Sequence, residues 1–438
     1  MITSVYGLLD WQFWAYAVVF LAFVWFVLRG LGYLWLRSLP TAPLSFFDWL
    51  IQQAMLIMLG LVSFTILGFI FAQQQLRILQ WLTVGAGLLG SLMLYLHSPK
   101  TKLVLNQSEK ITLGLIGVGT VLQLVAIVGS GLRFGNQVRF YFTNAQDGMM
   151  HLAFARSLVT TFPPVRPELL NLPLTSYHYF TDLLLAEQAR LFGIPITHAF
   201  FQFWPVVLSL LAGGFIVACI RELKGNQVAQ WFGILIWYLS GELAYVWNLL
   251  FHQTLNWNIA TIENSADQFL NMPQMFAKVL IFAAYYAAIR WYRVQNQKAW
   301  FFSTLIFVIS ATGFKVYFGL FNLALLVAIL VFGIVAKQIA VVPKKQVLSA
   351  ITSLLLPIVL AIVATAAIFL AVSGAKSRLD WVPLAWPKLL LSSDHLNFID
   401  WWLRMQVYEA AHSWKGIWAL NTIAIIVAVT SIIGTKLI

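Results

Sequence analysis

Long apolar stretches separated by short polar connections dominate this chain of 438 residues. A helix needs about 20 apolar residues to cross a bilayer, so the pattern predicts eleven membrane-spanning helices. The stretch 299–336 fits either two short spans hinged at Gly313, Phe314 and Lys315 or one long broken helix. The predicted spans are 11–36, 49–72, 78–97, 111–130, 199–220, 228–249, 273–292, 299–314, 316–336, 347–373 and 417–436.

Composition supports this class of protein. Hydrophobic residues make up 61% of the chain and charged residues 10%, whereas ordinary globular domains have about 45–50% and about 25%. We therefore expect an all-α, polytopic transmembrane bundle and not a soluble, disordered or fibrous protein. The single cysteine, Cys219, excludes an internal disulfide and a cysteine-based metal cluster. The first apolar stretch lacks the basic start and cleavage site of a signal peptide, so it should remain as a span.

The formal net charge of +12 reflects topology, and we expect no nucleic-acid partner. Alternate connections are rich in basic residues, whereas the opposite short connections carry only Arg77 and Lys315. The positive-inside rule then places the N-terminus outside and the C-terminus inside, in a membrane that we expect to be a prokaryotic plasma membrane. The basic connections carry Arg29 and Arg37; Lys100, Lys102 and Lys110; Arg221 and Lys224; Arg290, Arg293 and Lys298; Lys337, Lys344 and Lys345; and Lys436.

The predicted spans divide the chain into three regions. A four-span region at 1–130 precedes an external loop at 131–198, and a seven-span region at 199–438 contains a second external loop at 374–416. The two external loops hold most of the polar side chains, so a site is expected there.

The first external loop contains Asp147 and His151, four residues apart in a segment that reads as an amphipathic helix on the outer membrane face. Arg156 should point to the other side of this helix. One interpretation makes Asp147 a catalytic carboxylate. The other is structural, with Asn144 as the N-cap and Asp147 meeting the helix dipole.

Four prolines within 163–173 predict a rigid, extended crossing after this helix. The aromatic run that follows predicts a further helix, which would put His178 and Asp182 on one face. This arrangement fits a shaped surface pocket and equally fits a stiff loop with a local His–Asp pair.

Together these motifs resemble the C superfamily of membrane glycosyltransferases, and more closely its uncharacterised prokaryotic members. The residues that carry the resemblance are Asp147-x-x-x-His151, Phe162-Pro163-Pro164, Tyr177-His178-Tyr179-Phe180-x-Asp182 and Asn271-Met272-Pro273-Gln274. The resemblance covers 131–200 well and 250–322 loosely.

The resemblance implies a polyprenyl-phosphate-linked sugar donor, an external active site and a glycan, lipid or protein acceptor. A carboxylate must take the proton of the attacking hydroxyl, and Asp147 is the best candidate, which predicts inversion at the anomeric carbon. His151 and His178 could hold the acceptor or the phosphate, and Tyr177, Tyr179 and Asp182 complete the predicted substrate site. Lys315 could bind the phosphate, although it could equally snorkel from a helix end.

Further carboxylates lie elsewhere. Glu263 and Asp267 could bind a sugar or, with Asp147, a divalent cation, although a solvated helical face explains them as well. No cofactor is required by the pattern. Glu242 lies within a predicted span, where a carboxylate is functional by default or satisfied by a buried hydrogen bond. The last external loop adds Asp394, His395, Asp400 and His412, without a recognisable spacing.

We therefore expect an integral membrane glycosyltransferase that acts on the extracytoplasmic side. Two rival functions stay open. A transporter or flippase for lipid-linked glycans would show repeats and broken helices, of which only the candidate break at Gly313 is visible. An inactive cell-envelope scaffold is the other, because Asp147 has no acidic neighbour.

Overall fold

The computed structural model divides into two units, Met1–Ile234 with Phe269–Ser377, and Leu235–Gln268 with Arg378–Ile438. All contacts discussed below lie within the first unit. In the second unit the structure describes the end of one helix and four positions near the C-terminus. The residues that it describes are 5–36, 45–97, 105–124, 127–165, 172–174, 177–239, 269, 271–293, 298–320, 322–323, 359, 362–368, 415–416, 419 and 422.

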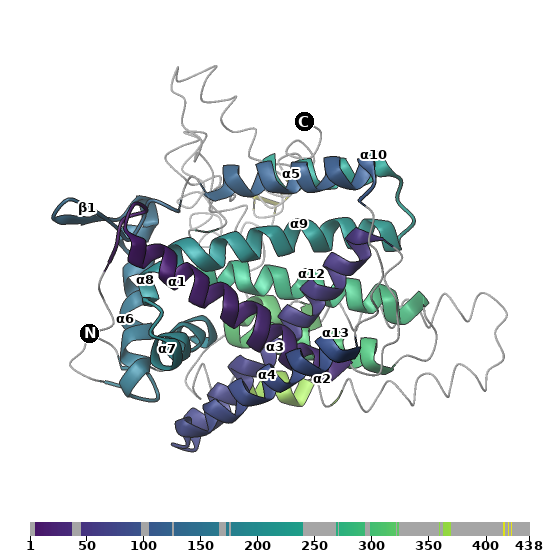
Figure 1. Cartoon of the computed structure of the whole chain (residues 1–438). Coiled ribbons are helices and arrows are strands. Elements are labelled where there is room, and N and C mark those ends of the chain that lie inside the picture. Colours follow the sequence, from purple (N-terminus) through teal and green to yellow (C-terminus); the bar gives the residue numbers. More distant parts are fainter. Residues whose placement is uncertain are drawn as a thin grey trace. The chain divides into compact units, whose positions relative to one another are not determined.

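The described residues are overwhelmingly helical, as the sequence predicts (Figure 1). One small antiparallel hairpin, β1 and β2, was not predicted; it turns through Gly135, whose φ of +59° suits glycine. The elements are α1 Trp11–Ala22, η1 Phe23–Leu28, α2 Arg29–Leu36, α3 Phe46–Gln73, η2 Arg77–Leu79, α4 Gln80–His97, α5 Gln107–Leu124, β1 Leu132–Phe134, β2 Gln137–Arg139, η3 Phe142–Ala145, α6 Asp147–Thr160, α7 Phe180–Phe192, α8 Ile196–His198, η4 Ala199–Phe203, α9 Trp204–Glu222, α10 Gln227–Leu239, α12 Met272–Arg293 and α13 Lys298–Phe314.

Five continuous helical stretches are long and apolar enough to cross a membrane, which supports an integral membrane protein. They match five of the eleven predicted spans and are Trp11–Leu36, Phe46–Gln73, Arg77–His97, Ile196–Glu222 and Met272–Trp291. The predicted span 228–249 is described as far as Leu239, in α10. Of the predicted spans 316–336, 347–373 and 417–436 the structure describes only 316–320, 322–323, 359, 362–368, 419 and 422.

Two further predicted spans are helical, one displaced toward its start and the other within one residue of its predicted bounds. The prediction 111–130 corresponds to α5, which begins at Gln107 and gives way to a turn at 127–130. Asn106 and Glu109 fix this early start, since each side chain accepts from the other residue's backbone N–H, at 2.8 and 3.2 Å. The prediction 299–314 corresponds to α13, which stops one residue before Lys315. Helix resumes at 316–320, so the chain breaks at Lys315, a break that both sequence interpretations predicted.

The long helices alternate in direction as the predicted topology requires. Near their starts α9 and α12 touch through Trp204 and Phe276, and near their ends Glu222 accepts from Arg290 at 3.0 Å. These helices are therefore parallel, and they lie side by side in Figure 1. The start of α3, at Phe47, lies beneath Arg221 near the end of α9. Helix α3 is therefore antiparallel to α9 and α12.

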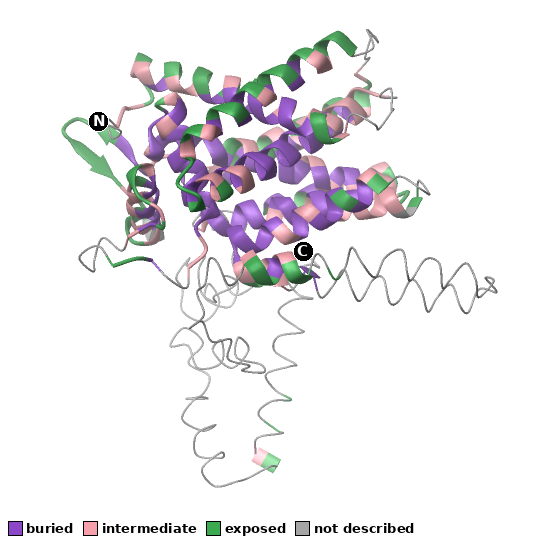
Figure 2. Cartoon of the chain, turned by 90° about the horizontal axis from the view of Figure 1, so that it is seen from below, coloured by how far each residue is buried: buried purple, intermediate pink, exposed green. Residues whose placement is uncertain are grey.

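Glycines let α2, α3 and α4 approach closely. A Cβ added at Gly60 would collide with the Leu28 carbonyl, and one at Gly32 would collide with the Leu56 carbonyl. Small residues at such contacts are typical of membrane helix pairs. Lipid removes the hydrophobic effect between the helices, so close backbone packing holds them together instead. Buried residues fill the spaces between helices and exposed residues line the outer faces (Figure 2).

We predict that Gly60→Ala destabilises the protein by about 1–3 kcal/mol, the usual cost of overpacking. The matched control is Gly117→Ala on α5, where an added Cβ meets nothing within 4 Å. Thermal melting in detergent should show a clear loss for Gly60→Ala and no loss for Gly117→Ala, because alanine favours helix over glycine. Equal melting temperatures for the two variants would contradict the close contact between α3 and η1.

Candidate functional site

Two short helices, α6 and α7, position the predicted site residues. Helix α6 buries one stripe at helical spacing, which includes His151, Phe154 and Leu158, while Arg156 is exposed as predicted. Helix α7 is buried along almost its whole length and ends at Gly193, whose φ of +67° is the left-handed conformation that glycine favours. The two helices pack against each other, which brings residues 31 apart in sequence into contact.

The predicted N-cap at Asn144 is wrong. Asn144 lies in the 3₁₀ turn η3, where its amide nitrogen contacts the Ser130 hydroxyl at 3.4 Å, and Gln146 occupies the cap position of α6. Because residues Phe142–Ala145 form this turn, α6 does not begin at Asn144. Asp147 is half-buried in the first turn of α6, with no cap from Asn144.

A buried His–Asp pair lies at the centre of the site. His151 Nδ1 lies 2.9 Å from Asp182 Oδ1, with the two side chains 1% and 0% exposed. The sequence put Asp182 on one helical face with His178, and this pairing is wrong. Helix α7 begins only at Phe180, so His178 precedes the helix, and the histidine that reaches Asp182 comes from α6.

Tyr177 extends this pair toward the surface. Its hydroxyl lies 3.2 Å from His151 Nε2, and its ring stacks on the His178 ring with centroids 4.5 Å apart. Burial raises the pKa of Tyr177 above its ordinary value, and the charges of Asp182 and Asp147 add to this effect. Tyr177 therefore stays protonated and offers a hydroxyl at the half-buried end of the chain of hydrogen bonds.

The protonation of Asp182 determines what Tyr177 offers to a ligand. When Asp182 is ionised and His151 is neutral, His151 donates from Nδ1 and accepts the tyrosine O–H at Nε2, which leaves the Tyr177 oxygen to accept. When Asp182 is protonated, both bonds reverse and Tyr177 can donate outward. Burial raises the pKa of Asp182, the charge of Asp147 adds to the rise, and His151 and Lys315 oppose it.

Lys315 and His178 form the second half of the site. The Lys315 ammonium lies 3.3 Å from Asn271 Oδ1 and 5.6 Å from the Tyr317 ring centre, and the residue is only 9% exposed. Burial lowers the pKa of His178 to about 2, and the charges of Lys315 and His151 contribute. His178 is therefore neutral beside a cation.

Two buried polar atoms in this cluster lack hydrogen-bond partners among the described residues. They are Nε2 of His178 and Oδ2 of Asp182. Buried polar atoms are nearly always paired, by protein or by ordered water. Their position beside Lys315 and Tyr177 indicates a place where a polar ligand group would be held.

Tyr179 supports the site from the core. It is 1% exposed, and its ring contacts Phe162 and Phe69. Burial raises its pKa to about 12. This places Tyr179 behind the site and away from the mouth of any groove.

The proline-rich segment pairs with itself and does not cross in one extended direction as predicted. Val165 and Pro173 form an antiparallel bridge, and the Leu174 N–H donates to the Pro164 carbonyl at 2.7 Å. The Phe162–Pro163 peptide is cis. The segment thus returns close to where it left α6 and delivers Tyr177 next to His151.

Sequence reasoning missed an ion cluster beside the site. Arg77 and Arg190 both pair with Glu187, whose side chain is 2% exposed, and Arg190 also donates to the Arg77 carbonyl at 2.9 Å. The i, i+3 spacing of Glu187 and Arg190 was the one available signal. Arg77 was assigned only to topology, but it ties the α3–α4 connection to α7.

Other predicted residues lie outside the described part of the chain. These are Glu242, Glu263, Asp267, Asp394, His395, Asp400 and His412. Within the described residues, no three His, Cys, Asp or Glu side chains gather as a metal site would require.

Comparison of the chain with protein-family models, curated proteins and solved structures found no match.

The buried, neutral His178 predicts a pH dependence of stability. Its pKa in the folded protein lies far below the ordinary value of about 6.5, so only the unfolded chain binds this proton as the pH falls below 6.5. Stability should therefore decrease on acidification, by at most about 2 kcal/mol for this residue between pH 7 and pH 5.

Thermal melting of His178→Gln should show a shallower loss over this range than the wild type. The exposed His97, at the end of α4, is the control, and His97→Gln should keep the wild-type slope. A wild-type slope in His178→Gln would show that His178 is not held neutral by burial.

Proposed function

We propose that this chain is an integral membrane glycosyltransferase that uses a polyprenyl-phosphate-linked sugar. One observation carries the proposal. The half-buried Asp147 lies one turn before His151 on α6, and His151 is hydrogen-bonded to Asp182 and Tyr177. The charge of Lys315 lowers the pKa of Asp182, so this cation also acts on the His–Asp pair. A base, a hydrogen-bonding hydroxyl and a cation are the groups that such a transfer needs.

In the proposed reaction Asp147 takes the proton from an acceptor hydroxyl. The acceptor oxygen forms a bond to the anomeric carbon while the bond from that carbon to the phosphate oxygen breaks. This displacement inverts the anomeric centre. The departing lipid phosphate carries the negative charge, which Lys315 neutralises while neutral His178 offers a hydrogen bond.

The donor should approach along α12 and α13. Asn271 and Gln274 lie at the start of α12, and each contacts the segment that follows α13, through Lys315 and Tyr317 respectively. An apolar polyprenyl tail must stay in lipid while its phosphate meets polar groups. Polar side chains at the ends of these apolar helices satisfy both requirements.

We place this site on the extracytoplasmic side. Arg221, Arg290 and Arg293 lie at the far ends of α9 and α12, away from the His151–Asp182 pair. By the positive-inside rule, that basic end is cytoplasmic. A lipid-linked donor assembled in the outer leaflet would meet Asp147 without crossing the membrane.

We expect Asp147→Asn to lower sugar transfer by at least about 100-fold, the usual contribution of a positioned base. Its melting temperature should change little, because the lost charge near a helix start costs only about 0.3–1 kcal/mol. The measurement is transfer from a polyprenyl-phosphate donor by the purified chain. Asp10→Asn removes a carboxylate near the start of α1, where it accepts from the Gly7 N–H, and should remain active.

If the rate of sugar transfer by Asp147→Asn stays within a few-fold of the wild-type rate, Asp147 has only a structural role at the start of α6.

We expect Lys315→Met to weaken binding of the donor by at least about tenfold while binding of the acceptor changes little, since the charge faces the phosphate. Equilibrium binding of a labelled polyprenyl-phosphate analogue measures this. Arg156→Met removes a cation from the exposed face of α6 and serves as the control. Unchanged donor affinity in Lys315→Met would assign the lysine to helix packing alone.

A further inference from the structure

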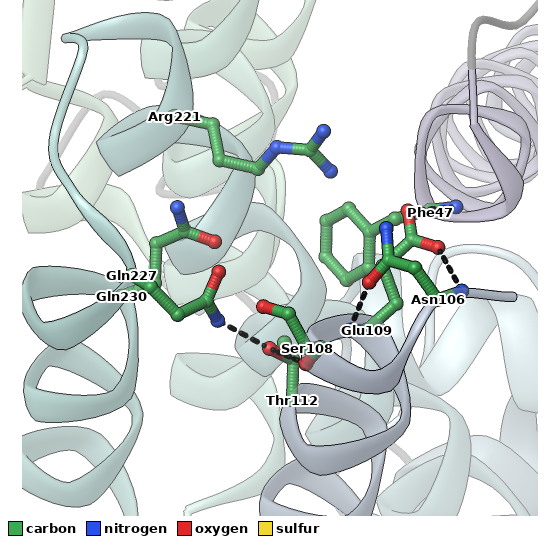
Figure 3. A pocket seen from close by; sticks show the side chains of 8 residues that line it. All are labelled: Phe47, Asn106, Ser108, Glu109, Thr112, Arg221, Gln227 and Gln230. Carbon is green, nitrogen blue, oxygen red and sulfur yellow. Dashed lines mark hydrogen bonds between the residues drawn. The ribbon is translucent and has the colours of Figure 1, made fainter.

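A polar pocket lies at the end of the helices opposite the His151–Asp182 pair, and Figure 3 shows the side chains that line it. The starts of α3, α5 and α10 meet the end of α9 there. The pocket has a volume of about 190 Å³. Pockets for drug-sized molecules measure about 300–1,000 Å³, so this one suits a smaller polar group. It is lined by Phe47, Asn106, Ser108, Glu109, Thr112, Arg221, Gln227 and Gln230.

Some of the residues that line the pocket form hydrogen bonds that hold the helices together. Glu109 accepts from the backbone N–H groups of Asn106 and Phe47, at 3.2 and 3.3 Å. The Thr112 hydroxyl accepts from the side chains of Gln227 and Trp231, at 3.0 and 3.2 Å. These bonds join α3, α5 and α10 and fix the shape of the pocket without any ligand.

Arg221 is the lining residue whose N–H donors are available to a ligand. Its guanidinium extends toward the pocket in Figure 3 and lies 5.1 Å from the Phe47 ring centre. Its carboxylate partner among the described residues is Asp48, at 3.4 Å, which is longer than a strong charge-assisted bond. A guanidinium has five N–H donors, so most of them can serve a ligand. Ser108 and Gln230 add polar groups from two other helices.

The surroundings are those of a lipid-facing site. Both neighbouring helices carry exposed apolar side chains, with Val118 and Val121 further along α5 and Val228 and Phe232 on α10. A ligand held by Arg221 could therefore extend acyl chains over these faces. A water-filled cavity would need only the polar lining and would gain nothing from the apolar surface beside it.

We propose that this pocket binds the phosphodiester head group of a membrane phospholipid, with Arg221 on the phosphate. Arginine presents paired donors that match phosphate oxygens, which a lysine cannot do. The lipid would stabilise the junction of α3, α5, α9 and α10. This site is independent of the proposed transfer reaction, because its residues lie at the other end of the helices.

The test is native mass spectrometry of the purified full chain in detergent, titrated with dihexanoylphosphatidylglycerol. We expect saturable binding that Arg221→Gln weakens at least tenfold and Arg221→Lys restores in part. Lys298→Gln removes an exposed cation at the start of α13 and should bind as the wild type does. If Arg221→Gln does not fold, Ser108→Ala and Gln230→Ala should each weaken binding several-fold instead.

Three results would overturn the proposal. The first is unchanged lipid binding in Arg221→Gln, or in Ser108→Ala and Gln230→Ala. The second is equal binding of dihexanoylglycerol, which has no phosphate. The third is equal affinity for inorganic phosphate alone, which would make the pocket a site for free anions.

Discussion

The hydrogen bond between His151 and Asp182 is the interaction on which the site depends. It joins α6 to α7 in a place where water is excluded, so either partner alone would be a costly unpaired polar group. Because Asp182 fixes Nδ1 of the ring, Nε2 must face Tyr177. The direction of the hydrogen bond between His151 and Asp182 therefore determines whether the half-buried Tyr177 hydroxyl accepts a hydrogen bond from a ligand or donates one to it.

The helices around this pair keep it in place. Glu187, one turn further along α7, binds two arginines and so attaches α7 to the α3–α4 connection. Phe180 packs against Phe314, which ends α13 immediately before the break at Lys315. The same helix, α7, thus holds the aspartate, the ion cluster and the contact to the cationic segment.

The sequence predicted the helical class, five spans, the helix from Asp147 and the break beside Lys315, because apolar periodicity and helix-breaking residues are local signals. It could not predict that Asp182 pairs with His151 instead of the nearer His178. That choice depends on where α7 begins and on how the proline-rich segment folds back, and both are set by tertiary contacts. Arg77 was misjudged for the same reason, since its carboxylate partner is 110 residues away.

The most direct test of the proposed function is an experimental structure of the protein with a polyprenyl-phosphate analogue bound. The account predicts that the phosphate lies within hydrogen-bonding distance of Lys315 and His178. It also predicts that the tail runs into lipid beside α12 and α13 and that Asp147 faces the carbon where the sugar would be attached. Absence of the analogue's phosphate from Lys315 and His178, or a tail path remote from Asp147, would contradict it.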